Sequence, residues 1–305
     1  MVPPLRVVLK ATFRTRGALN VAFQASQRAA YARRVTASPI FRMLVGGRLR
    51  GTRDHPVRDA TGALLGYAAV AGPGEVAEAV AAAKAALPGW AATTADERGR
   101  VLHGVAELLD ERRDRLAADL SAADGIAVDA AAELVDAAVD RWVWYAGWTD
   151  KIAAVLGAVH PVTGPYVGWS APRPVGVVGA VCLPSLPALV EALAPVLAAG
   201  ATAVVVAPHE RPVGAAALAE VLRTAELAAG AANVLTGPVG ELATRLTGVD
   251  GLDLTGAPDD VAPDVITAAA ERGARVLAPA VIDDPPLSRL RAWSEVTTVW
   301  HPVGR

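Results

Sequence analysis

The chain is poor in cysteine: Cys182 is the single thiol among 305 residues. One cysteine excludes an internal disulfide framework and is usual for proteins of the reducing cytoplasm, where we therefore place this protein. Cys182 lies within the apolar run VVGAVCL, which predicts a buried strand. Burial makes a thiol pack as a small hydrophobic side chain and raises its pKa. We therefore expect Cys182 to be a core residue and not a nucleophile.

Long apolar runs and a strong net charge are also missing. No uninterrupted apolar stretch reaches the length of about 20 residues that a membrane-spanning helix needs. With a net charge of −2, the basic surface of a nucleic-acid-binding protein is not expected. Hydrophobic residues make up 53% of the chain, which is enough for one large domain or two modest ones.

Acidic residues are absent before Asp54. The segment 1–40 is therefore a basic N-terminal arm, with Arg6, Lys10, Arg14, Arg16, Arg28, Arg33 and Arg34. This composition is that of an organellar transit peptide, and it also suits an amphipathic arm that docks on a partner or an anionic membrane. We favour a partly disordered extension, because the Ala-, Val- and Arg-rich composition is typical of a GC-rich bacterial gene.

The first half of the chain predicts helices. Apolar spacing indicates one helix over Glu75–Leu87, and a second that begins at Thr94 and runs to about Ala123. Thr94 and Glu97 have the spacing of an N-cap residue and its partner. A third helix is predicted over about Ala127–Trp148. It ends in an aromatic cluster that we expect to pack in the core or an interface: Trp142, Trp144, Tyr145 and Trp148.

The second half alternates strands with helices. Proline and glycine in Leu156–Trp169 favour a β-hairpin. The alternation from Pro174 onward predicts an α/β fold, a Rossmann-like parallel sheet with covering helices. Its strands are expected near Val175–Val181, Ala203–Val206, Asn233–Leu235, Gly251–Leu254 and Arg275–Leu277.

Several segments together resemble the aldehyde dehydrogenase family, from about Arg42 onward. PVGVVGAV and ALAPVLAAGATAVVV are similar to the first strand, helix and second strand of the family's cofactor domain, and GAANVLTG and GLDLTGA to the next strand ends. RWVWYAGWTDKI is similar to the segment that leads into the oligomerisation hairpin, and AWSEVTTVWHPVG to the C-terminal strand. Each motif alone is weak, but their shared order and spacing carry the resemblance.

The family's catalytic residues have no counterparts here. Pro279 stands where an "ELGGK"-type motif places the glutamate base, and Ser185 stands where a "PWN"-type loop places the oxyanion-binding asparagine. After DDPPLSRLR the chain passes directly to the C-terminal strand, so the resemblance implies that the catalytic domain is missing. Loss of nucleophile, base and oxyanion donor argues against aldehyde oxidation by this chain alone.

The resemblance implies NAD or NADP as cofactor, bound at the carboxyl ends of the strands. The corresponding residues lie in three places: Pro208 and Glu210; Gly237 and Gly240; Thr255 and Gly256. Glu210 keeps the acid of a "KP-x-E" motif, but Ala207 replaces its lysine. The glycines suit close approach to a pyrophosphate, and equally an ordinary strand–helix turn.

Two departures weaken these places for a cofactor. The first is the lost lysine, and the second is the pair Asp259 and Asp260, whose charges oppose a phosphate. His209 is expected to be a solvated loop side chain. Cofactor binding is thus either retained in weakened form or lost.

The resemblance also divides the chain. Beyond the arm, residues 41–150 and 171–285 form a helical, NAD-binding-like domain, and 151–170 with 291–305 form the oligomerisation hairpin and C-terminal strand. The β-forming residues 296–299 and Trp300 suit a strand that pairs at an edge. We expect an inactive subunit that forms a homo- or hetero-oligomer with a full-length aldehyde dehydrogenase paralogue. The alternatives are an NAD(P)-dependent oxidoreductase that acts on aldehydes, through Cys182 or by direct hydride transfer, and a nucleotide-binding sensor.

Overall fold

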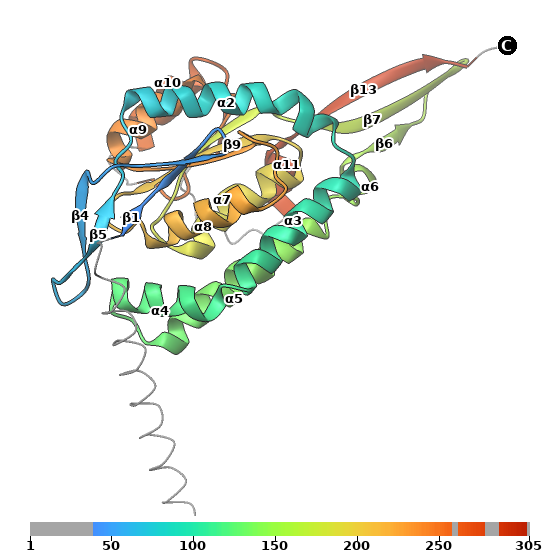
Figure 1. Ribbon diagram of the computed structural model, residues 1–305. Coiled ribbons are helices and arrows are strands. Elements are labelled where there is room, and N and C mark those ends of the chain that lie inside the picture. The colour runs from blue at the N-terminus through green and yellow to red at the C-terminus, as the bar shows by residue number, and fades with distance from the viewer. Residues whose placement is uncertain (1–38, 258–261, 278–286, 304–305) are drawn as a thin grey trace, which may run out of the picture. The chain divides into compact units, whose positions relative to one another are not determined.

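A seven-stranded sheet forms the centre of the computed structural model, which describes residues 39–257, 262–277 and 287–303 (Figure 1). Its strand order is β12-β11-β8-β9-β10-β2-β3. Five strands are parallel, as predicted: β8 (Val177–Val181), β9 (Thr202–Pro208), β10 (Ala232–Gly237), β11 (Gly251–Asp253) and β12 (Arg275–Leu277).

Two antiparallel strands that the parallel-sheet prediction did not include extend the sheet beyond β10. They are β2 (Met43–Val45) and β3 (Arg48–Arg50), joined by a tight turn in which Gly46 and Gly47 have φ values of 57° and 77°. Glycine adopts this left-handed conformation without strain. The sheet is therefore mixed, with an antiparallel ribbon at one edge.

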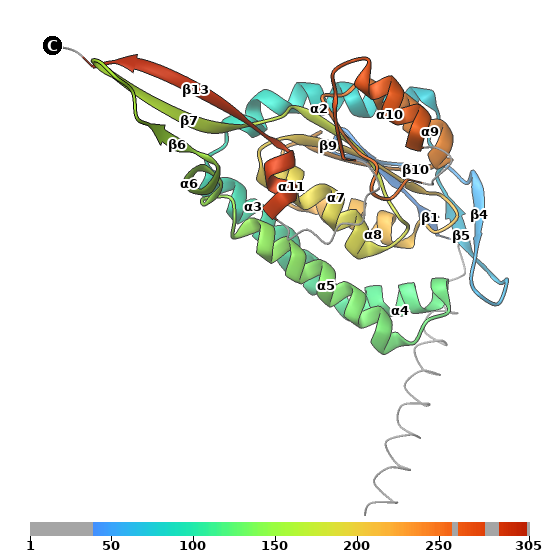
Figure 2. The ribbon, with the colours of Figure 1, turned by 180° about the vertical axis from the view of Figure 1, so that it is seen from behind.

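Helices cover both faces of the sheet (Figures 1 and 2). One face carries α2 (Pro73–Ala92), α9 (Val239–Arg245) and α10 (Ala262–Ala270), with the 3-10 turn η1 (Leu246–Gly248) after α9. The other face carries α7 (Leu186–Ala198) and α8 (Val213–Thr224), and outside them α3 (Ala95–Asp110), α4 (Arg113–Asp124) and α5 (Val128–Ala146).

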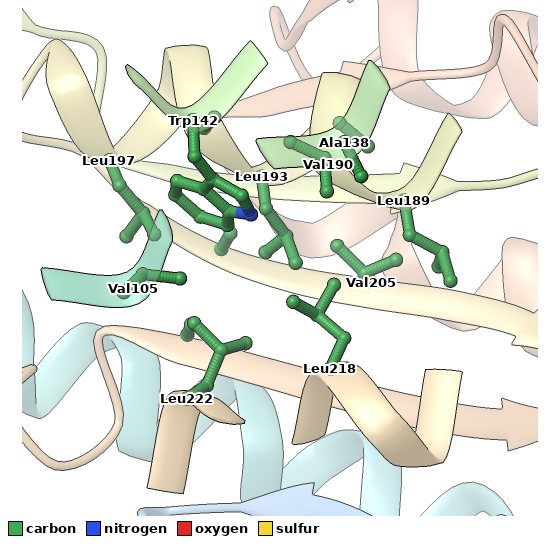
Figure 3. Packing of buried hydrophobic residues seen from close by; sticks show 14 of the residues in the cluster. Val105, Ala138, Trp142, Leu189, Val190, Leu193, Leu197, Val205, Leu218 and Leu222 are labelled. Atoms are coloured by element: carbon green, nitrogen blue, oxygen red, sulfur yellow. The ribbon is translucent and has the colours of Figure 1, made fainter. Parts of the chain in front are cut away.

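The larger core lies between the sheet and this double layer of helices. Helix α7 is apolar on nearly all sides because it is enclosed between β9 and α5. Figure 3 shows Trp142 of α5 packed among Leu193 and Leu197 of α7. Trp142 and Tyr145 are fully buried. The ring centroid of Trp144 lies 4.9 Å from that of Tyr145 and 5.3 Å from that of Trp148. The expectation that this aromatic cluster packs within the structure is confirmed.

The single helix predicted from Thr94 to Ala123 is wrong in one respect, because the structure contains two helices. Thr94 caps α3 as expected, accepting a hydrogen bond of 3.2 Å from the Glu97 amide. The helix ends at Asp110 and α4 begins at Arg113. The break lets α4 bury its own leucines against α5, where Arg113 pairs with Asp136.

Two small sheets complete the fold. The first joins β1 (Ile40–Phe41), β5 (Leu64–Ala68) and β4 (His55–Arg58). The second joins β13 (Ser294–Pro302), β7 (Tyr166–Pro174) and β6 (Ala158–His160), and it extends away from the body (Figure 2). We call it the assembly sheet. The hairpin predicted over Leu156–Trp169 is confirmed as β6 and β7, although Leu156 itself is the last residue of the short helix α6 (Ile152–Leu156).

The basic arm, apart from residues 39 and 40, lies outside the described residues, as do Asp259, Asp260 and Pro279. Among the described parts of the chain, no helix is long and apolar enough to cross a membrane. Those same parts contain no group of three or more histidine, cysteine, aspartate or glutamate residues arranged to hold a metal ion.

Candidate functional site

The carboxyl ends of the parallel strands meet along one edge of the sheet, and all six predicted cofactor residues lie at or just beyond it. Pro208 and Gly237 are direct partners at the ends of β9 and β10. Glu210 follows β9 by two residues, and Gly240 lies in the first turn of α9. Thr255 and Gly256 follow β11, on the far side of β8. The edge thus has a β9–β10 half and a β8–β11 half.

Glu210 and His209 stand at the β9–β10 half. The Glu210 side chain is 61% exposed, and its Oε2 lies 3.5 Å from His209 Nδ1. His209 is only 15% exposed, because its ring packs edge-on against His55 of β4 with centroids 4.6 Å apart. The prediction that His209 is a solvated side chain is therefore wrong.

A pocket of about 210 Å³ adjoins Glu210, between the end of α4 and the start of α8. Asp124, Arg211 and Arg58 also line it. Burial raises the pKa of the Asp124 carboxyl, and the Arg211 guanidinium 3.9 Å away opposes this effect. Exposed carboxylates such as Glu210 can accept hydrogen bonds from the hydroxyls of a ribose.

Gly237 lies in a tightly packed turn. A Cβ at this position would lie 2.5 Å from Leu242 Cδ1 and 3.3 Å from the Ala71 carbonyl oxygen. The glycine therefore lets α9 lie close against β10. This packing accounts for a glycine in the turn between β10 and α9, and no ligand is needed to explain it.

Thr255 and Gly256 at the β8–β11 half are engaged within the chain. The Thr255 hydroxyl donates to Asp253 Oδ1 at 2.7 Å and accepts from Arg289 Nη2 at 3.1 Å. A Cβ at Gly256 would lie 2.5 Å from the Leu183 nitrogen and 2.8 Å from the Cys182 backbone. The loops after β8 and β11 are therefore in direct contact.

A buried ionic cluster surrounds this half, and its residues were not identified as a site from the sequence. Arg289 of α11 (Leu287–Ala292) places Nη1 2.6 Å from Asp253 Oδ2 and Nε 3.2 Å from Glu191 Oε1. Arg141 and Tyr145 of α5 also contact the Glu191 carboxylate, at 3.0 and 2.7 Å. Burial and the Glu191 charge raise the pKa of Tyr145. The sequence signal was an aspartate in the otherwise apolar run GLDL.

Cys182 follows β8 and is 4% exposed. Burial raises the pKa of its thiol well above the ordinary value, and the Asp253 carboxylate adds to the rise. The expectation of a core thiol is confirmed. Ser185 caps α7, where its Oγ accepts from the Ala188 amide at 3.4 Å, so its hydroxyl has a structural role.

The two halves of the edge differ in their fit to a nicotinamide dinucleotide. The β9–β10 half presents the exposed Glu210 carboxylate and an adjoining pocket. The β8–β11 half does not fit, because the Arg289 guanidinium takes up the Thr255 hydroxyl and the backbone at Gly256 meets the neighbouring loop. We derive no chemical step through the cofactor.

Comparison with known proteins identifies the family. The sequence model of the family described as "Aldehyde dehydrogenase family" matches residues 52–279. The alpha-ketoglutarate semialdehyde dehydrogenase of Haloferax volcanii is 34% identical over 59% of this chain and 37% of its own length. The glutarate-semialdehyde dehydrogenase of Pseudomonas putida is 32% identical over 66% of this chain and 42% of its own length.

Solved structures agree with these matches. HpcC from Thermus thermophilus has a TM-score of 0.74 at 27% identity, covering 82% of this chain and 50% of that one. The NAD-dependent aldehyde dehydrogenase from Sinorhizobium meliloti has a TM-score of 0.71 at 25% identity, covering 78% of this chain and 49% of that one. The chain spans about half or less of the length of these relatives. On the family match and the shared fold, the chain belongs to the aldehyde dehydrogenase family.

Proposed function

We propose that this chain is a catalytically inactive subunit that associates with a full-length, NAD(P)-dependent aldehyde dehydrogenase paralogue in the cytoplasm. The observation that carries the proposal is a contrast within one chain. Its only thiol is buried with a raised pKa, whereas the assembly sheet is formed and exposed. In this proposal the paralogue supplies the nucleophile, the base and the reacting half of the cofactor site.

The buried thiol supports inactivity of the chain alone. A thiolate is the nucleophilic form of cysteine, and both burial and a nearby carboxylate oppose its formation. At Cys182 both effects act together, because the side chain is 4% exposed and Asp253 is close enough to raise the pKa. Cys182 is therefore suited to packing and not to attack on an aldehyde.

One face of the assembly sheet offers a continuous apolar row. Val159, Trp169 and Val299 are direct cross-strand partners on β6, β7 and β13. Val159 is 79% exposed and Trp169 37% exposed. Val299 is half-buried, so the row has two exposed members, and exposed apolar side chains in register on neighbouring strands are a feature of protein–protein interfaces.

The outer edge of the assembly sheet supports strand pairing with another subunit. Strand β13 has nine residues, most of them exposed, and among the described residues it pairs with β7 alone. Such an edge presents free backbone donors and acceptors that a partner strand can take up. The opposite face adds Val296 and Trp300, which are 55% and 62% exposed.

We retain four of the six predicted cofactor residues, without Thr255 and Gly256, and the predicted parts of the chain within this proposal. Pro208, Glu210 and Gly240 remain proposed contacts for the adenosine side of NAD or NADP, together with Gly237. The segments 151–170 and 291–305 remain the proposed assembly part, and 41–150 with 171–285 the cofactor-domain part.

Co-expression with the full-length paralogue encoded nearest to it, followed by native mass spectrometry, tests the association. We expect a defined hetero-oligomer with the wild-type chain, and its loss with Trp169→Glu, because the charge would lie within the apolar row. Val143→Glu is the matched control, since Val143 is an exposed apolar residue (39%) on α5, outside the assembly sheet. A homo-oligomer that ignores the paralogue would contradict the proposal, and aldehyde-dependent NADH formation by the purified chain alone would favour the oxidoreductase alternative.

A further inference from the structure

The sheet reverses its strand order between β8 and β11. From β8 the chain continues through β9 to β10 on one side, whereas β11 and β12 lie on the other. In open α/β sheets, ligands bind outside the carboxyl ends of the strands at such a switch point. The ligand position that topology predicts therefore lies between the loop after β8 and the loop after β11.

Arg289 fills the space beside this position. Its side chain is 6% exposed, and its guanidinium contacts β11 and α7 at once. Nη1 donates to Asp253 Oδ2 at 2.6 Å and to the Glu191 carbonyl oxygen at 3.4 Å, and Nη2 donates to Thr255 Oγ1 at 3.1 Å. A buried guanidinium beside two carboxylates is held strongly by charge-assisted interactions.

The groups at the switch point are already engaged within the chain. The Thr255 hydroxyl has used its one proton on Asp253, and it accepts from Arg289. The backbone of Gly256 packs so closely against Cys182 and Leu183 that a Cβ at position 256 would lie 2.5 Å from the Leu183 nitrogen. A ligand group that binds in the place of the guanidinium beside Thr255 must therefore compete with Arg289.

Helix α11 is fastened at its other end as well. The buried Trp293 packs against Gly251, where a Cβ would lie 2.8 Å from the indole ring. Arg275 Nη1 donates to the carbonyl oxygens of Ala292, at 2.5 Å, and Ser294, at 3.0 Å. The segment of α11 and Trp293 is thus anchored to both β11 and β12, and it leads directly into β13 of the assembly sheet (Figure 2).

We propose that Arg289 is an internal plug that closes the β8–β11 half of the edge to the nicotinamide half of a dinucleotide. A dinucleotide binds across the switch point only when α11 has moved away. This inference rests on the proposed function, because it identifies the contact that keeps the nicotinamide half of the cofactor out of an inactive subunit.

Titration of the purified chain with NADH, followed by isothermal calorimetry, tests the plug. Arg289→Ala is expected to bind NADH about tenfold or more tightly than the wild type, because the competing closed state is removed. Arg291→Ala is the matched control, since that side chain is exposed on the same helix, and it should leave the affinity unchanged. Millimolar guanidinium ion should refill the vacated space and weaken NADH binding to Arg289→Ala but not to the wild type.

A second variant covers the case in which Arg289→Ala fails to fold. The double variant Asp253→Ala with Arg289→Ala removes both charges of the pair, so no carboxylate at position 253 is left buried without its cation. In the wild type, saturating NADH should increase hydrogen exchange at the amides of residues 287–292. Unchanged affinity in a folded variant, or binding to the wild type without faster exchange in α11, would overturn the proposal.

The outcome is separate from that of the association experiment. A hetero-oligomer together with unchanged NADH affinity in the variants would remove the plug and keep the subunit function. Tighter NADH binding by Arg289→Ala without any hetero-oligomer would keep the plug and remove the subunit function.

Discussion

At the scale of single residues, the charges inside this fold are arranged as a network and not as isolated pairs. Arg289 and Asp253 are almost fully buried, and Glu191 joins them to Arg141 and Tyr145. Burying a charge is costly unless it is paired and hydrogen-bonded. The short helix α11 therefore contributes the buried Arg289 cation and the buried Leu290, and Trp293 packs directly after its last residue.

Asp124 is the residue for which the structure predicts a pH dependence. Its folded-state pKa is raised above the ordinary 3.8 by burial, so the folded state favours the protonated carboxyl. The stabilising contribution of the protonated Asp124 carboxyl is therefore fully present below the ordinary pKa of 3.8, and it is lost as the pH rises through the folded-state pKa.

We expect Asp124→Asn to be more stable than the wild type at pH 7, where the carboxylate is charged, and to lose this advantage as the pH falls toward 4. Urea denaturation across this pH range measures the difference, and Asp129→Asn on the exposed start of α5 is the control. A constant difference at every pH would show that charge burial is not its cause.

At the scale of elements, two glycines differ in how closely other atoms pack against their backbone. Gly104 lies inside α3, and a Cβ there meets nothing within 4 Å. Gly256 lies where two loops touch, and a Cβ would meet backbone atoms at 2.5 and 2.8 Å. Backbone cannot move aside as a flexible side chain can.

The same substitution should thus have opposite effects at these two sites. Gly104→Ala is expected to stabilise the chain by about 0.5–1 kcal/mol through helix propensity. Gly256→Ala should destabilise it by about 1–3 kcal/mol, the usual cost of overpacking. Chemical denaturation of both variants checks the signs, and stabilisation by Gly256→Ala would show that the loops do not touch.

At the scale of the whole molecule, the central strands are covered on both faces, and Cys182 lies at the end of the central strand β8. Neither thiolate formation nor access by a reagent is favoured there. The thiol therefore reports on opening of the entire domain.

We expect labelling of Cys182 by a thiol reagent to be slow in buffer and to accelerate with urea in parallel with global unfolding, as for a group protected by the most stable part of a fold. The slope of the labelling free energy against urea should match the equilibrium m-value. Fast labelling without denaturant would place the thiol in a locally opening segment and revive it as a candidate nucleophile.

Local patterns in the sequence determined much of this protein. Apolar runs predicted β8 and β9, because a strand buried on both faces reads as continuous apolar sequence, and the alternation of strands and helices predicted β10, β11 and β12. Thr94 marked a helix start, because capping needs only residues within one turn. The burial of Cys182 followed from its place in an apolar run.

Tertiary structure alone decided the remaining features, because they depend on residues far apart in the chain. The break between α3 and α4 is favoured by packing on α5, and His209 is covered by His55 of another sheet. The partner of Asp253 lies 36 residues away on a helix after the last parallel strand. Electrostatic pairing at that distance has no local signature, so only the folded chain shows that its own arginine occupies the place beside the switch point.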